Sequence, residues 1–105
     1  MYARIARFDV GVANVDAAVA AARGNIATAR AGGDGPEAQL TKHAERVLLL
    51  VDRGSGSAAM LVLCKTKGDL DAADAILNAM SPPDEYSGRR TAVEKFEIAV
   101  DEAFA

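Results

Sequence analysis

At 105 residues and a formal net charge of −3, the chain is long enough for one hydrophobic core and too short for two. Its positive and negative charges are interspersed, which excludes the basic patch expected of a protein that binds nucleic acid or an anionic membrane surface. Half of its residues are hydrophobic and many of these are alanine, so the sequence predicts a single domain over residues 1–105 with a core of many small side chains.

The chain begins with a predicted strand and a predicted helix. Residues 2–10 are β-tolerant and alternate between two sets of side chains, which is typical of a strand. Asn14 is a favourable N-cap for a helix ending near Arg30, in which apolar residues form one stripe: Val15, Val19, Ala22, Ile26 and Ala29. The Gly- and Pro-containing run at 31–36 ends this helix, and the polar connection up to Glu45 has room for one short helical turn.

Residues 46–65 are the most informative stretch, because a Gly/Ser turn at 53–56 joins two apolar runs. We predict an antiparallel hairpin with strands at 46–52 and 57–66. Antiparallel strands with one wet face alternate apolar and polar side chains, whereas both runs are apolar at nearly every position. We therefore expect both faces of the sheet to be covered, one by the chain's own helices and the other by a second copy of the same sheet.

The C-terminal third predicts a second helix and a last strand. The helix extends over 68–80, since its early acidic residues complement the helix dipole and its apolar residues form a stripe. Pro82 and Pro83 end it, and a polar loop leads to the last strand at 91–100. The charges on that strand are typical of a sheet edge.

The order of the predicted elements, β-α-β-β-α-β, indicates an α+β domain of the ferredoxin-like type, with two helices on one face of a four-stranded antiparallel sheet. Several families share this plan, and their functions require particular residues. An RNA-recognition module needs aromatic side chains on its central strands, but the run AAMLVLC has none. A metal-transfer domain needs a Cys-x-x-Cys loop, and the chain contains one cysteine. Both of these functions are excluded.

Three segments of the chain resemble the dimeric α/β barrel superfamily that contains antibiotic biosynthesis monooxygenase-like domains. They are the opening MYARIARF, the hairpin and helix VLLLVDRGSGSAAMLVLCKTKGDLDAADAI, and the closing VEKFEIAVD. The resemblance implies a ferredoxin-like subunit that forms a homodimer by packing two sheets face to face into a barrel. It supports the architecture more than any one activity, because these motifs mark the fold.

The resemblance also bears on cofactors. Haem-degrading members of the superfamily rely on an asparagine in the first strand, a tryptophan and a histidine in a helix. This chain has Arg7 and Phe8 in the first strand, no tryptophan, and its one histidine, His43, in a predicted loop. We therefore expect no haem, no other cofactor and no metal.

Three residues are candidates for catalysis: Arg7, Tyr86 and His43. His43 is the one side chain that titrates near neutral pH, although no nucleophile or ligand set accompanies it in the sequence. Tyr86 lies in the loop before the last strand, where it and two arginines form a possible cavity mouth. Cys64 is expected to pack in the core as a small hydrophobic side chain.

Arg4 and Arg7 fall on opposite faces of a predicted central strand, where charges are costly unless they are paired or line a pocket or an interface. The resemblance places the last strand beside the first. We therefore expect ion pairs with Glu94 or Glu97, with pocket and interface roles as alternatives.

The cellular compartment of the protein can be predicted from its single cysteine and its lack of long apolar runs. Cys64 has no partner for an internal disulfide, which fits a reducing environment. No apolar run approaches the ~20 residues that span a bilayer, and the N-terminal residues lack the apolar region of an export signal. We expect a cytoplasmic protein.

Three functions remain open from the sequence. The first is binding of a small apolar or aromatic molecule between sheet and helices. The second is a cofactor-independent monooxygenase, in which an electron-rich aromatic substrate supplies the reducing power and the pocket supplies desolvation and acid/base groups. The third is a non-enzymatic structural or regulatory dimer. A continuous cavity favours the first two, and a solidly packed interior favours the third.

Overall fold

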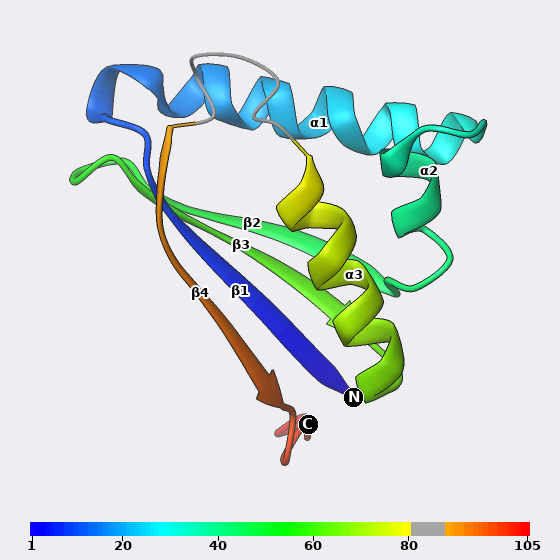
Figure 1. Cartoon of the computed structure of the whole chain (residues 1–105). Helices are drawn as coiled ribbons and strands as arrows, with labels where there is room; N and C mark the ends of the chain where they lie inside the picture. The colour runs from blue at the N-terminus through cyan, green and yellow to red at the C-terminus, as the bar shows by residue number, and fades with distance from the viewer. Residues whose placement is uncertain (81–87) are drawn as a thin grey trace.

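All three α-helices of the described chain lie on one side of a four-stranded antiparallel sheet (Figure 1). The structure, a computed structural model, describes residues 1–80 and 88–105. The strands lie in the order β2-β3-β1-β4 and are β1 (Tyr2–Asp9), β2 (Arg46–Asp52), β3 (Ser57–Cys64) and β4 (Arg89–Glu97). The helices are α1 (Val15–Ala31), preceded by the 3-10 turn η1 (Val12–Asn14), then α2 (Pro36–Leu40) and α3 (Lys67–Ala79). This α+β arrangement is compatible with the predicted ferredoxin-like fold.

The predicted hairpin is confirmed, with β2 and β3 joined by the turn at 53–56, although β3 ends at Cys64 and not at residue 66. Gly56 has a φ of +73°, and its carbonyl accepts hydrogen bonds from the backbone N–H groups of Val10 and Gly11. A Cβ added to Gly56 would lie 2.4 Å from the carbonyl carbon of Gly11. Only glycine combines this backbone conformation with such a close approach, so Gly56 joins the hairpin turn to the segment between β1 and α1.

The first helix starts where predicted, but the helices differ from the predictions in their capping and in number. Asn14 occupies the N-cap position of α1, but its side-chain amide donates to the carbonyl of Val10 (3.1 Å) and does not cap the helix. The connection between the two predicted helices contains an additional short helix, α2. It begins at Pro36, because proline has a φ suited to the first helical turn. The N-cap of α3 is Thr66, whose hydroxyl accepts the backbone N–H of Asp69 (3.0 Å).

The prediction that the last strand extends to residue 100 was wrong at its end. β4 ends at Glu97, which is paired with Tyr2, the first residue of β1. After one further backbone hydrogen bond, from Ile98 to Met1, the chain has no partner strand left to pair with. The residues beyond it are exposed, including Val100 (77%).

Two core clusters lie between the sheet and the helices. One combines Val62 and Cys64 of β3, both fully buried, with Leu70 and Ala73 of α3. The other forms at the opposite end of the sheet and consists of small residues: Val10, Val15, Ala18 and Ala58. The core is therefore built from small side chains, as the composition predicts.

The opposite face of the sheet carries no element of the described chain (Figure 1). Side chains alternate along a strand, and Val62 and Cys64 of β3 face the helices. The residues that alternate with them on β3, and the residues paired with these on the other strands, therefore point to this opposite side. Its apolar residues, which we call the open face, are Ala3, Ile5, Leu48, Leu50, Ala59, Leu61, Leu63, Ala92 and Phe96. Leu50 and Phe96 are each 50% exposed. The hairpin is thus apolar on both faces, as predicted from its sequence.

Candidate functional site

A cavity of about 440 Å³ lies between the C-terminal half of α1, the segment from α2 to β2, strand β3 and the end of α3. The buried residues of α1 are Val15, Ala18 and Ala22, all in its N-terminal half. Further along the same stripe, Ile26 and Ala29 line the cavity. The stripe predicted from the sequence is therefore shared between the core and a hollow that opens to solvent.

The wall of this cavity is mainly apolar. Its larger side chains are Ile26, Leu40, Val47, Met60, Leu77 and Met80. Two of these are methionines, whose unbranched side chains adapt to irregular shapes. Such a wall favours the apolar body of a ligand over a polar one, because burying a polar group without a hydrogen bond is costly.

Polar side chains also line the cavity, mainly exposed or half-exposed ones: Asn25, Arg30, Glu37, Thr41, Glu45 and Arg46. Two of them are already engaged. The Thr41 hydroxyl donates to the carbonyl of Ala38 (2.6 Å), and Glu45 lies 3.5 Å from the ammonium of Lys65. This polar set is suited to holding a ligand's polar end near the solvent.

His43 does not line the cavity, although its neighbours Thr41 and Ala44 do. Its Nδ1 lies 2.9 Å from Oδ1 of Asp69, at the start of α3. This hydrogen bond is the largest of the contributions that hold the pKa of Asp69 below its usual range. His43 thus connects the segment before β2 to α3, a partner that the sequence analysis missed.

Arg7 lies on the opposite side of the sheet from the cavity. Its Nε donates to Oε1 of Glu94 (2.8 Å), so the predicted ion pair is confirmed, and both side chains are substantially exposed. Tyr86 lies outside the described residues. Arg7 and His43 therefore do not form one catalytic site.

Cys64 is fully buried, as expected for a core residue. Burial, followed by the negative charges of Asp69 and Glu45, raises the pKa of its thiol. A raised pKa disfavours the thiolate that a nucleophile or metal ligand requires. Within residues 1–80 and 88–105 there is no group of three or more His, Cys, Asp or Glu side chains that could hold a metal ion.

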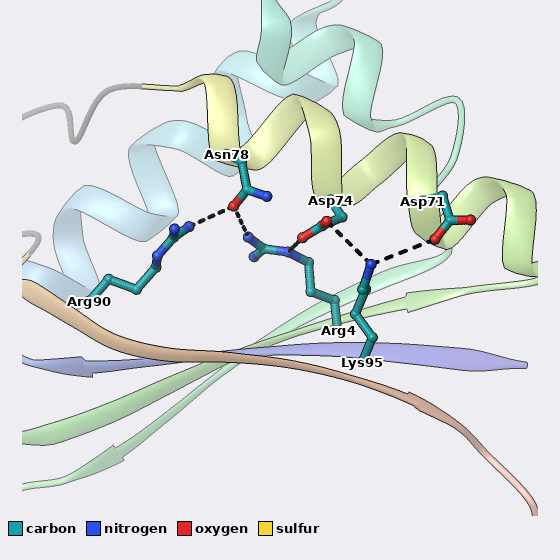
Figure 2. Close-up of polar contacts among 6 residues, drawn as sticks. All are labelled: Arg4, Asp71, Asp74, Asn78, Arg90 and Lys95. Carbon is teal, nitrogen blue, oxygen red and sulfur yellow. Dashed lines mark hydrogen bonds and ion pairs between the residues drawn. The ribbon is translucent and has the colours of Figure 1, made fainter.

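Arg4 is the centre of a polar network that the sequence analysis did not foresee (Figure 2). It is 2% exposed and points toward α3, where its Nε donates to Asp74 (2.8 Å) and its Nη2 to Asn78 (3.0 Å). Arg90 also donates to Asn78 (2.7 Å), and Lys95 lies 3.5 Å from Asp74. The expected pairing of Arg4 with a β4 carboxylate was wrong, because the β4 residue opposite Arg4 is Lys95.

This network satisfies the buried guanidinium, since two α3 side chains accept its hydrogen bonds. The Arg4 hydrogen bond is the main cause that lowers the pKa of Asp74, against the opposing effect of burial. Asp74 and Asn78 are four residues apart and so lie on one side of α3. The network holds α3 against β1 and β4, and its described residues do not line the cavity.

Comparisons with known proteins do not assign the chain to a family: no protein-family model and no curated protein sequence matches it. In the described residues, no helix has the length and apolar character needed to cross a membrane.

Proposed function

We propose that this protein binds a small, largely apolar molecule in the cavity between sheet and helices. The observation that carries the proposal is the cavity itself, about 440 Å³ in volume and lined mainly by aliphatic and methionine side chains. This volume lies within the ~300–1,000 Å³ typical of small-molecule sites, whose walls are mostly apolar with a few polar groups. A molecule with an apolar body and one polar end fits both the wall and the polar residues near the solvent.

A thermal-shift and calorimetric titration with decanoic acid and 2-naphthol tests the proposal, since the two probes compare an aliphatic with an aromatic body. A probe present at about 100 times its dissociation constant stabilises the folded state by ~2.7 kcal/mol. For a domain of this size, that corresponds to a melting temperature higher by roughly 10 °C. The absence of a shift and of binding heat with both probes would count against the proposal.

A pair of variants on α1 localises the binding. Ala29 lines the cavity, whereas Ala27 lies on the same helix, is exposed and does not line it. We expect Ala29→Leu to narrow the cavity and reduce the thermal shift, and Ala27→Leu to leave the shift unchanged. Equal binding by the two variants would place the ligand elsewhere.

A cofactor-independent monooxygenase is the alternative, and the lining residues favour it less. A general base must approach the substrate's reacting proton within hydrogen-bond distance, directly or through one water. The described lining offers Glu37 and Glu45 for this purpose and no His, Tyr or Cys. Oxygen consumption with a naphthoquinol, above the uncatalysed rate and reduced by Ala29→Leu but not by Ala27→Leu, would favour the oxygenase over simple binding.

We also propose that two copies of the chain associate through the open face. Support comes from the area and the apolar character of this face. Eight-residue strands at ~3.3 Å per residue, four of them ~4.8 Å apart, give roughly 500 Å² of sheet on each copy. That matches the ~1,000 Å² in total that a specific interface needs, before the relief of the side chains is added.

Sedimentation velocity at micromolar concentration tests this association. Leu61 lies on β3 near the middle of the open face, opposite both Ile5 and Leu48. We expect Leu61→Lys to produce monomers, because it would place a charge in the centre of an apolar contact. Val12→Lys is the matched control, since Val12 is 61% exposed on η1 and lies outside the open face. A wild-type monomer at this concentration would refute the proposal.

A further inference from the structure

Phe96 is the most prominent side chain of the open face. It is 50% exposed and points away from the helices, because the preceding residue on β4, Lys95, points to the other side and contacts Asp71 and Asp74 of α3. Its partner on β1 is Ala3, which is small and 7% exposed. The ring therefore lies over a small neighbour at one end of the sheet, where Arg46 begins β2.

A groove lies at the other end of the same face. Its lining includes Arg7, Leu50, Ser57 and Ala59, with Asp52 at the hairpin end. Ala59 is paired with both Arg7 and Leu50, so a short side chain lies between two long ones. The groove results from this difference in side-chain length, and the apolar side chain of Leu50 forms one of its walls.

We propose that Phe96 of each copy occupies the groove between Leu50, Ala59 and Arg7 of the other copy. This inference rests on the proposed association through the open face. A two-fold interface makes every contact twice, and Phe96 and the groove lie toward opposite ends of one face. They meet when the two-fold axis runs diagonally across the two sheets. The strands of one copy then cross the strands of the other, as in orthogonal sheet packing.

A different orientation of the two copies would bring different residues into contact. An axis parallel to the strands would place Phe96 over Arg46 of the second copy, since both residues lie at the same end of the sheet on opposite edge strands. That arrangement would leave both grooves empty. The two orientations therefore predict different cross-links.

Disulfide cross-linking distinguishes them. We expect the double variant Phe96→Cys/Ala59→Cys to form a covalent dimer on mild oxidation, and Phe96→Cys/Arg46→Cys to form little. Wild-type protein is the control for the native thiol, because Cys64 is fully buried. A sedimenting dimer that cross-links through 96/46 and not through 96/59 would overturn the inference while leaving the association intact. A monomer by sedimentation would overturn both.

A truncation measures the contact without introducing cysteines. We expect Phe96→Ala to raise the dimer dissociation constant roughly 100-fold, about tenfold for each of two symmetric contacts. Phe104→Ala is the matched control, because Phe104 is fully exposed beyond the end of β4. Equal dissociation constants for the two alanine variants would also overturn the inference.

Discussion

The buried Arg4–Asp74 pair should make Asp74→Ala one of the most destabilising changes at a polar residue of this chain. Arg4 is 2% exposed, and its hydrogen-bonded partners are Asp74 and Asn78. Removing one member of a buried ion pair typically costs ~3–5 kcal/mol, because the other charge stays buried without compensation. Asn78 still accepts one hydrogen bond and the Asp74 side chain is 18% exposed, so we expect a loss near the lower end, ~3 kcal/mol.

Urea unfolding at neutral pH, followed by far-UV circular dichroism, measures this loss. A decrease of ~3 kcal/mol in the free energy of unfolding corresponds to a melting temperature lower by at least ~12 °C. Asp71→Ala is the matched control, since Asp71 is on the same helix, is 56% exposed and lies 3.8 Å from Lys95. An exposed pair of this kind contributes less than ~1 kcal/mol.

A second substitution tests the reason for the loss. If an uncompensated guanidinium is responsible, Arg4→Met added to Asp74→Ala should recover part of the stability, because it removes the buried charge. Equal losses for Asp71→Ala and Asp74→Ala, or no recovery in the double variant, would refute the reasoning.

Two further predictions concern the hairpin turn and acid stability. Gly56→Ala should lower the free energy of unfolding by ~2–4 kcal/mol, because the added Cβ meets backbone at 2.4 Å at a φ of +73°; Gly24→Ala, with no atom within 4 Å, should raise it by up to ~1 kcal/mol. A smaller loss at Gly56 than at a typical surface site would contradict this. The pKa of Asp74 is lowered from 3.8, so its contribution is complete above that value and is lost as pH falls through the folded-state pKa. Urea titrations between about pH 5 and pH 3 should therefore show a steeper loss of stability in the wild type than in Asp74→Ala, and parallel slopes would exclude this role.

The elements of the fold were predictable because their signals are local. A Gly/Ser turn between two apolar runs specifies a hairpin, and an apolar stripe at helical spacing specifies α1 and α3. The end of β4 was mispredicted, because residues 98–100 continue the strand-like pattern but have no partner on β1, which begins at Tyr2. Strand pattern depends on the residues themselves, whereas strand length depends on the partner.

The sequence indicated which buried charge needs a hydrogen-bond partner, but it did not indicate which residue that partner is. A charged residue on a central strand is costly unless it is paired or lines a pocket or an interface, and the sequence analysis favoured pairing for Arg4. The acid that pairs with it lies 70 residues away on α3, among helix charges that ordinarily face water. The available signal was the spacing of Asp74 and Asn78, which places two hydrogen-bond acceptors on one side of the helix next to its apolar stripe. His43 and Asp69, 26 residues apart, carried no comparable pattern.

The cavity depends on side-chain sizes and the spacing of whole elements, which no local pattern records. Ala18 and Ala22 allow the first half of α1 to pack closely, since alanine adds little beyond the backbone. The second half meets the segment from α2 to β2, and there Ile26 and Ala29 are too small to fill the space beside Met60. The same β3 strand presents Ala59 and Leu61 to the open face. A ligand and a second copy of the chain would therefore contact adjacent residues of one strand from its two sides, which is why the cavity variant is placed on α1 and the association variant on the open face.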